Sequence, residues 1–140
     1  MKEYLKKYGN ETTCPVIAIV RDGKVLFGLR HYTPDKWKTI SVWTCPGGRC
    51  DEGERVENTL RREVKEETGI TEIEITDYLG EVPGAKEGDV VPLFIAITKE
   101  EPRLMEPEKF SDWRWFGVSD FPENFINSAA KELILRFLAK

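Results

Sequence analysis

Three glutamates stand close together in one short stretch of the chain, at positions 63, 66 and 67. Because an α-helix turns by about 100° per residue, Glu63, Glu66 and Glu67 would lie on one narrow stripe of a helix. Like charges at this spacing destabilise a helix, and a divalent cation would convert that repulsion into a binding site. Oxygen-only ligands suit Mg²⁺ or Mn²⁺, so the spacing predicts a site for one of these ions.

The glutamates belong to a longer pattern, GRCDEGERVENTLRREVKEETGI, which covers residues 48–70. The segment resembles the box of the Nudix (MutT-related) hydrolases, Gly-x5-Glu-x7-Arg-Glu-U-x-Glu-Glu-x-Gly-U, where U is a bulky aliphatic residue. The alternative is a solvated acidic helix face, but that alternative does not account for both glycines and the arginine. The matching residues are Gly48, Glu54, Arg62, Glu63, Val64, Glu66, Glu67, Gly69 and Ile70.

The resemblance implies metal-dependent hydrolysis of a nucleoside diphosphate linked to a further group. It also implies an α/β (α+β) fold of the Nudix type, an α/β/α sandwich with a mixed β-sheet between helices. The catalytic residues that it implies are Glu63, Glu66, Glu67, Arg62 and Glu54. The implied ligands of Mg²⁺, or alternatively Mn²⁺, are Glu63, Glu67, Glu66, the backbone of Gly48, and Glu108.

Several of these roles have alternatives. Glu54 either supports the metal site or only favours the helix N-terminus through the helix dipole. Arg62 either orients a catalytic glutamate, as the resemblance implies, or forms a simple i, i+4 ion pair with Glu66. Which carboxylate acts as general base stays open. Glu108 is chosen because an EPEK segment followed by WRWF resembles Nudix enzymes that act on nucleoside triphosphates, with Glu106 as the alternative.

Candidate substrate-binding residues are cations and aromatic residues around the motif. Cationic side chains can hold phosphates through charge-assisted hydrogen bonds, and aromatic rings can stack on a nucleobase. Each aromatic residue could instead belong to the core, and the single histidine could be an ordinary loop residue. The candidates are Arg30, His31, Lys38, Trp43 and Phe110.

The subfamily marks favour a small nucleotide enzyme. The proline that ADP-ribose pyrophosphatases carry after the box is replaced by Lys86, and the SQPWPFPxS element of NADH-type members is absent from the sequence. We therefore expect a (d)NTP-type pyrophosphohydrolase that releases a nucleoside monophosphate and pyrophosphate. The alternatives are a hydrolase of ADP-ribose, nucleotide sugars or dinucleoside polyphosphates and, in another class, a non-catalytic nucleotide-binding sensor.

The overall composition fits a single globular domain over residues 1–140, with 40% hydrophobic and 33% charged residues. The net charge of −4 gives no broad electrostatic reason to bind a nucleic acid polymer. No apolar run approaches the roughly 20 residues that cross a membrane, and we expect a cytoplasmic enzyme. An odd number of cysteines, Cys14, Cys45 and Cys50, predicts free thiols. The resemblance leaves a homodimer open.

The elements that must position these residues follow from hydrophobic periodicity. Residues 55–68 predict the helix that carries the glutamates, and an apolar stripe of Val56, Leu60 and Val64 would face a sheet. Gly69 is expected to end this helix. A second helix is predicted over residues 127–139. The expected strands cover residues 15–21, 24–30, 42–45, 72–80, 90–98 and 112–117.

Overall fold

Two apolar, β-branched segments form the centre of the sheet. They are β1 (Val16–Arg21) and β5 (Val90–Ile97), which run parallel with Val16 paired to Leu93. The middle of each strand is buried, residues 17–19 of β1 and 91–96 of β5, as expected for strands that are covered on both faces. The computed structural model describes residues 1–31 and 41–140.

The other strands extend the sheet on both sides of this parallel pair. β2 (Lys24–Arg30) is antiparallel to β1, and β4 (Glu74–Pro83) is antiparallel to β5. β3 (Val42–Thr44) and β6 (Phe110–Phe116) both pair with β2. The described strands form one mixed six-stranded sheet in the order β3-β2-β1-β5-β4, with β6 joined to β2.

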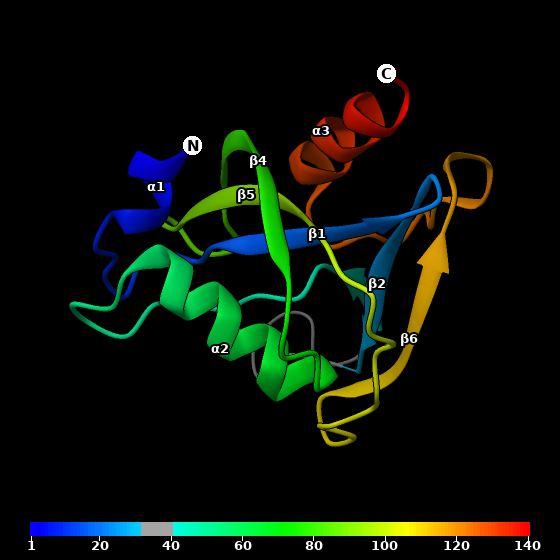
Figure 1. Ribbon diagram of the computed structural model, residues 1–140, viewed down its shortest axis with the longest axis horizontal. Helices are drawn as coiled ribbons and strands as arrows, with labels where there is room; N and C mark the ends of the chain where they lie inside the picture. Colours follow the sequence, from blue (N-terminus) through cyan, green and yellow to red (C-terminus); the bar gives the residue numbers. More distant parts are fainter. Residues whose placement is uncertain (32–40) are drawn as a thin grey trace.

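Helices cover both faces of this sheet. Figure 1 shows α2 (Val56–Thr68) on one side of β1 and α3 (Ser128–Leu138) on the other. A short N-terminal helix, α1 (Lys2–Lys6), contacts α2, and a 3₁₀ turn, Val118–Asp120, follows β6. The architecture is therefore the expected α/β/α sandwich with a mixed sheet.

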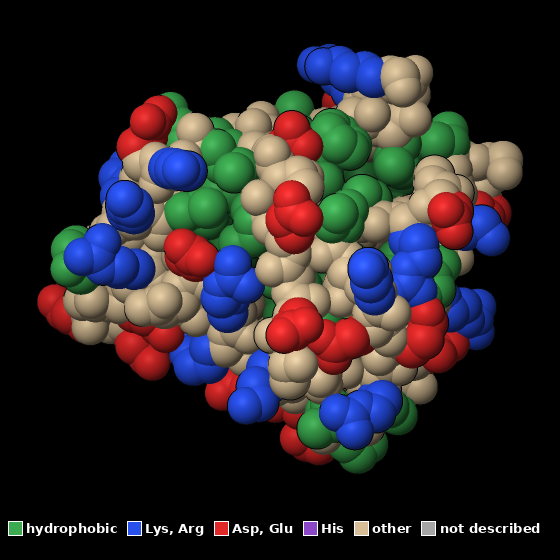
Figure 2. Space-filling view, in the orientation of Figure 1, with side chains coloured by type: hydrophobic (Ala, Val, Ile, Leu, Met, Phe, Trp, Pro, Cys, Tyr) green, Lys and Arg blue, Asp and Glu red, His purple; other side chains and the backbone are tan. Residues whose placement is uncertain are grey.

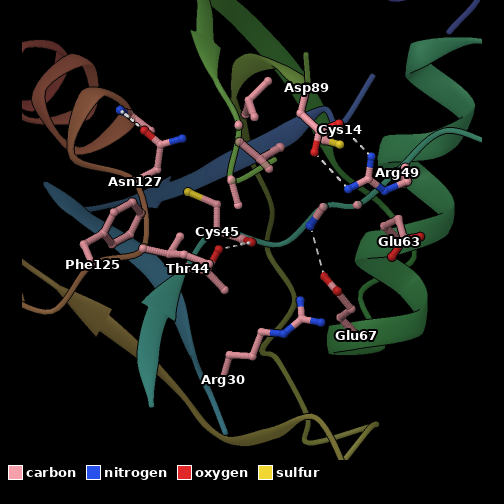
Figure 3. Close-up of a pocket in the computed structure, with 18 of the residues that line it drawn as sticks. Cys14, Arg30, Thr44, Cys45, Arg49, Glu63, Glu67, Asp89, Phe125 and Asn127 are labelled. Carbon is pink, nitrogen blue, oxygen red and sulfur yellow. Dashed lines mark hydrogen bonds and ion pairs between the residues drawn. The ribbon is translucent and has the colours of Figure 1, made fainter. Parts of the chain in front are cut away.

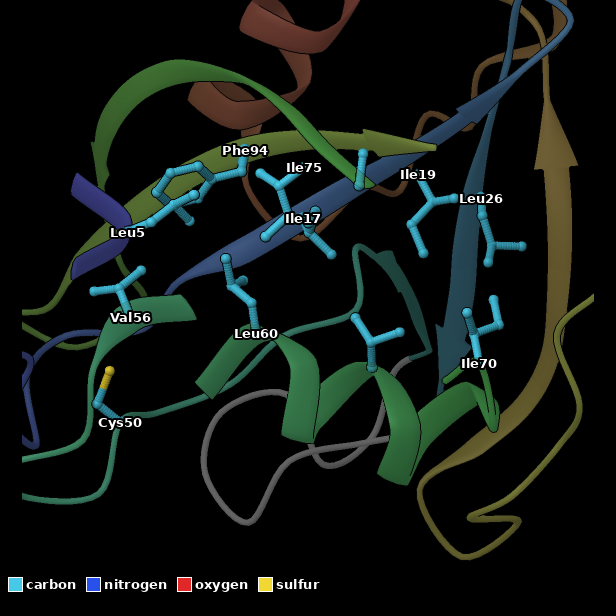
Figure 4. Packing of buried hydrophobic residues seen from close by; sticks show 12 residues of the cluster. Leu5, Ile17, Ile19, Leu26, Cys50, Val56, Leu60, Ile70, Ile75 and Phe94 are labelled. Carbon is cyan, nitrogen blue, oxygen red and sulfur yellow. The ribbon is translucent and has the colours of Figure 1, made fainter. Parts of the chain in front are cut away.

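The alternation of side chains along β1 builds two separate cores. Successive residues of a strand point to opposite faces of the sheet. Ile17 and Ile19 pack toward α2 together with Leu60 and Phe94, as Figure 4 shows. Ala18, between them, belongs to the cluster under α3. The helices α2 and α3 are thus fixed to the sheet by separate apolar clusters.

The helix that carries the glutamates is anchored as its sequence predicts. Val56, Leu60 and Val64 are at most 2% exposed and face the sheet. The helix ends at Gly69, which has a left-handed conformation with φ 76° and whose backbone N–H donates to the carbonyl of Lys65. Anchoring along one stripe leaves the neighbouring stripe, with the glutamates, facing away from the core.

The predicted elements agree with the structure apart from their ends. β4 continues three residues beyond the predicted strand, to Pro83, because the whole segment pairs with β5. β6 begins two residues early, at Phe110, since that residue pairs with Arg30. The short helix α1 was not predicted. All three cysteines are free. In the described part of the chain, every helix is too short or too polar to cross a membrane.

Candidate active site

Glu67 lies at the centre of the site, near the C-terminal end of α2. Its side chain is buried, and its Oε1 accepts a hydrogen bond from the backbone N–H of Gly47 at 3.0 Å. Burial raises the pKa of the Glu67 carboxyl well above its usual range, although the Gly47 bond opposes the shift. A buried carboxylate is costly unless it is paired or coordinates a metal, so a bound cation would stabilise the ionised form of Glu67.

Glu63 lies one turn earlier on α2 and packs against the backbone of Gly48. A Cβ atom at position 48 would lie 2.7 Å from the Cδ of Glu63, so only glycine allows this approach. Burial raises the pKa of the Glu63 carboxyl, while the neighbouring Arg62 guanidinium lowers it. The glycine turn and the helix thus bring Glu63, Glu67 and two backbone groups together.

Arg62 connects the carboxylates on this side of α2. Its Nε and Nη2 donate to the two oxygens of Glu54, both at 2.9 Å. Its Nη1 donates to Glu63 at 2.8 Å and to Glu66 at 3.2 Å. Hydrogen bonds from Arg62 lower the pKa of Glu54 to about 2. The i, i+4 pair with Glu66 therefore exists, but it is one contact of a guanidinium that also fixes Glu54 and Glu63.

A cavity of about 400 Å³ opens beside Glu63 and Glu67. In Figure 3, residues from the sheet, from α2, from the β4–β5 turn and from the segment before α3 surround it. Its charged lining residues are Arg30, Arg49, Glu63, Glu67, Lys86, Asp89 and Lys109, and its apolar lining includes Val16, Cys45, Val91, Phe110, Phe125, Ile126 and Ala130. In Figure 3, Arg49, Glu63, Glu67 and Asp89 lie toward one end of the cavity, which is therefore charged, and Phe125 lies at the other end, where an uncharged ring system would fit.

The loop between β5 and β6 brings Glu106, rather than Glu108, toward this cluster. Glu106 is half-buried, and its negative charge contributes to the raised pKa of Glu67. Its Oε1 is buried and has no hydrogen-bond partner in the part of the chain that the structure describes. Glu108 is exposed to solvent. Glu106, the alternative to Glu108, is therefore the residue whose carboxylate lies near Glu67.

The predicted substrate residues divide into two groups. Arg30 and Phe110 line the cavity, and the buried Nε of Arg30 has no partner among the residues described. Trp43 is instead a core residue, packed edge-on against Phe116, because its side chain points to the α3 face of β3. The ring of His31 lies 3.2 Å from the carbonyl of Pro107 and is not part of the cavity lining. Lys38 lies outside the described residues.

Other lining residues carry little signal in the sequence. Arg49 follows Gly48 inside the motif, so its place near the glutamates could have been inferred from sequence. Lys86, Phe125 and Asn127 come from the β4–β5 turn and from the segment before α3. Asn127 also caps α3, since its side chain accepts a hydrogen bond from the N–H of Ala130. Only the tertiary fold brings these distant segments to one cavity.

The donor chemistry fits a hard divalent cation. Glu63 and Glu67 both line the cavity, and the charge of Glu106 helps to raise the pKa of Glu67. One oxygen of Glu106 has no partner among the described residues. Within residues 1–31 and 41–140, no three carboxylate, imidazole or thiol groups converge into a complete coordination set. Glu66 is exposed and paired with Arg62. The oxygen ligands thus match Mg²⁺ or Mn²⁺ in type, with water or substrate oxygens needed to complete the shell.

Comparisons with known proteins bear on the family and the fold of this chain. The family model of the NUDIX domain matches residues 12–137. The NAD-capped RNA hydrolase NudC of Vibrio atlanticus is 30% identical over 86% of this chain, which spans 43% of that protein. An RNA pyrophosphohydrolase of Caulobacter vibrioides is 30% identical over 77% of this chain and 72% of its own length. The crystal structure of a MutT NUDIX hydrolase from Burkholderia pseudomallei superposes with a TM-score of 0.71 at 31% identity, covering 89% of this chain and 95% of the other.

Proposed function

This chain belongs to the Nudix hydrolase family, and from that premise we propose that residues 1–140 form one catalytic domain that hydrolyses a (d)NTP-type nucleotide. The products would be a nucleoside monophosphate and pyrophosphate. The observation that carries the proposal is the cavity whose lining combines Glu63 and Glu67 with cationic side chains such as Arg30 and Lys109. Carboxylates for a cation and guanidinium or ammonium groups for phosphates are what a polyanionic substrate requires.

In this proposal, water attacks one phosphorus atom and the bridging P–O bond on its far side breaks. The leaving pyrophosphate takes the electron pair of that bond, and the water gives up a proton to solvent through a carboxylate of the site. When bound, Mg²⁺ or Mn²⁺ would neutralise phosphate charge and lower the pKa of a water. We expect this ion to be held by Glu63, Glu67 and Glu106. Glu66 would become a further ligand if its carboxylate turned from Arg62 to the ion.

Arg62 and Glu54 support the reaction without touching the reacting atoms. The two hydrogen bonds between them fix the guanidinium beside Glu63. A guanidinium that is held on one edge loses little freedom when its other N–H groups orient a carboxylate. Gly47 orients a second carboxylate, that of Glu67. Its backbone N–H donates to one oxygen of Glu67, and the other oxygen has no partner among the described residues.

The size and lining of the cavity support a mononucleotide substrate. About 400 Å³ falls in the range of small-molecule sites. The apolar part, with Phe125 and Ile126, suits a base, while Arg30 and Lys109 suit phosphates. Figure 2 shows acidic and basic side chains interspersed over the face in view, without a continuous basic surface for a polymer.

A second candidate substrate is the 5′ end of an RNA chain. The two relatives named above act on NAD-capped RNA and on RNA, respectively, and each is 30% identical to this chain. The bond that would be cleaved is the same diphosphate linkage. The two candidates differ in whether the chain beyond the first nucleotide contributes to binding.

A hydrolysis screen with Mg²⁺ or Mn²⁺ tests the proposal. The compounds are the eight common NTPs and dNTPs, 8-oxo-dGTP, ADP-ribose, a nucleotide sugar, a dinucleoside tetraphosphate and a 5′-triphosphorylated RNA oligomer. We expect pyrophosphate and a monophosphate from a triphosphate, and loss of at least about 10²-fold in kcat for Glu67→Gln. The exposed Glu52→Gln variant serves as the matched control.

Other outcomes would redirect the proposal. Turnover of ADP-ribose, a nucleotide sugar or the dinucleoside compound alone would keep the site and overturn the triphosphate substrate. A kcat/KM at least tenfold higher for the RNA oligomer than for any mononucleotide would favour the second candidate. Tight metal-dependent binding without any turnover would contradict catalysis and favour the sensor alternative.

A further inference from the structure

Asp89 carries a buried carboxylate in the wall of the same cavity. It directly precedes β5, and its side chain is 6% exposed. Both of its oxygens accept hydrogen bonds from Arg49, each at 2.9 Å. These bonds lower the pKa of the Asp89 carboxyl, so the pair is ionised at neutral pH. The Nudix motif does not include Asp89, and the mechanism described above does not use it.

The β4–β5 turn is shaped to hold this carboxylate in place. The N–H of Gly84 donates to the carbonyl of Asp89, and the N–H of Asp89 donates to the carbonyl of Lys86, both at 3.0 Å. A Cβ atom at position 84 would lie 2.6 Å from the Cβ of Asp89, so glycine is required there. The turn therefore fixes the backbone from which the Asp89 side chain reaches Arg49.

The bonds to Asp89 leave one edge of the Arg49 guanidinium without a partner. Nη1 donates to Asp89 and to the carbonyl of Glu11, and Nη2 donates to Asp89. A guanidinium has five N–H groups, so the Nε–H and the second Nη2–H remain. Neither has an acceptor among residues 1–31 and 41–140. This is the edge that Arg62 uses to bind Glu54.

A free edge with two parallel donors suits an anion that presents two oxygens, such as phosphate or carboxylate. Arg49 directly follows Gly48, against which Glu63 packs, so its guanidinium belongs to the charged end of the cavity. We propose that Asp89 is a positioning residue that holds Arg49 so that its Nε–Nη2 edge binds a phosphate group of the substrate. This inference rests on the proposed function, because the phosphate belongs to the nucleotide.

Steady-state kinetics on the preferred substrate provide the first test, with Arg49→Ala, Arg49→Lys and Asp89→Asn. Arg49→Ala removes charge-assisted hydrogen bonds, and we expect KM to rise about tenfold or more while kcat changes less than threefold. Arg49→Lys keeps the charge without the fork, so its KM should also rise. Asp89→Asn replaces one carboxylate oxygen by an amide nitrogen, which is a donor and faces a donor of Arg49. We therefore expect a smaller increase in KM, of about three- to tenfold.

Arg61→Ala is the matched control. The Arg61 side chain is 43% exposed, as is that of Arg49, and it also donates to one carboxylate at 2.9 Å, that of Glu57. Arg61 is outside the cavity lining. The KM of the Arg61→Ala variant should equal that of the parent protein. Equal KM values for Arg49→Ala and the parent would overturn the proposal.

Chemical rescue separates positioning from a merely structural ion pair. Free guanidinium ion at millimolar concentration should lower the KM of Arg49→Ala, because Asp89 would still hold the ion. The double variant Arg49→Ala/Asp89→Asn should not respond. Rescue that is equal in both variants would overturn the role of Asp89. This comparison, with Arg49→Lys, decides the question even if Asp89→Asn alone fails to fold.

The specificity of the effect identifies the ligand. A phosphate contact predicts the same KM increase for every base, whereas a loss confined to guanine nucleotides would show that the edge reads a base and would overturn the phosphate assignment. Calorimetry with inorganic pyrophosphate and Mg²⁺ gives a readout without turnover, and Arg49→Ala should bind it at least about tenfold more weakly. If the parent hydrolyses no compound, the proposed function fails while this binding result still tests Arg49.

Discussion

The hydrogen bonds of Glu54 bear on both stability and catalysis. Its side chain is 16% exposed and accepts two hydrogen bonds from Arg62, one from the backbone N–H of Asp51 at 3.0 Å and one from the hydroxyl of Thr59 at 2.7 Å. A carboxylate that accepts several charge-assisted bonds is much more acidic in the folded protein than in the unfolded chain. The residue therefore makes the stability of the protein depend on pH.

We predict that Glu54→Gln lowers the free energy of unfolding by about 1–3 kcal/mol at pH 7. The folded-state pKa of Glu54 is about 2, below the unfolded value. Its stabilisation is thus complete above the unfolded value of about 4.3 and is lost as the pH falls toward 2. Urea unfolding at several pH values should show the parent and the variant converging in acid.

Glu52→Gln is the control for this experiment, because Glu52 is exposed in the same turn. The free energy of unfolding of this variant should follow that of the parent at every pH. A difference between Glu54→Gln and the parent that persists unchanged at pH 2 would contradict the role given to the ionised carboxylate.

The close approach of Gly48 to Glu63 makes a second prediction at this scale. In Gly48→Ala the new methyl group would overlap the Glu63 carboxyl, which must move. Displacement of a site residue by about 1 Å costs roughly 10²-fold in rate, so we expect kcat to fall by that order. Gly117→Ala, where the nearest atom would be 3.3 Å away, should keep the parent rate. Normal activity in Gly48→Ala would contradict a fixed place for Glu63.

Among the elements, α2 serves two purposes on adjacent faces. Its apolar stripe packs on the sheet while its acidic stripe faces the cavity. Leu60 is completely buried in the middle of the apolar stripe. We predict that Leu60→Ala lowers the free energy of unfolding by about 2–5 kcal/mol, measured by urea denaturation. The exposed Leu104→Ala should change it by less than about 0.5 kcal/mol. Similar values for the two variants would contradict the packing described here.

Elements with strong periodicity could be predicted from sequence, and elements fixed by pairing could not. The stripe of Val56, Leu60 and Val64 is a local pattern, and it predicts α2 to within one residue. The ends of β4 and β6 depend on how far β5 and β2 extend beside them, which the local sequence does not encode. Helix α1 has five residues and too short a pattern to be distinguished from a turn.

The same distinction applies to the candidate site. The residues of the motif lie within one turn and one helix, so their spacing in sequence determines their spacing in space. Glu106 and Glu108 are equally acidic in sequence, and only the path of the loop turns one inward and the other outward. Arg49 and Asp89 meet only because the glycine turn and the β4–β5 turn lie side by side in the folded chain.

At the scale of the whole molecule, the candidate metal site links ion binding to stability. A ligand that binds only the folded state stabilises it, by about 2.7 kcal/mol at a concentration 100 times its Kd. We predict that Mg²⁺ raises the Tm of the parent and that EDTA reverses the increase. Glu67→Gln should lose most of this response, because its carboxylate is replaced. A Tm that rises equally in both proteins would contradict a role for Glu67 in holding the ion.

The parallel pairing of β1 with β5 has a consequence for the order of folding. The two central strands are distant in sequence, and the glycine turn, α2 and β4 all lie between them in the chain. Closing so long a loop costs conformational entropy before the contact is made, so such pairings form late. The β1–β2 and β4–β5 hairpins and α2 are local and can form early. We therefore expect Arg49 and Asp89, which lie next to these two strands, to meet only in the last step of folding.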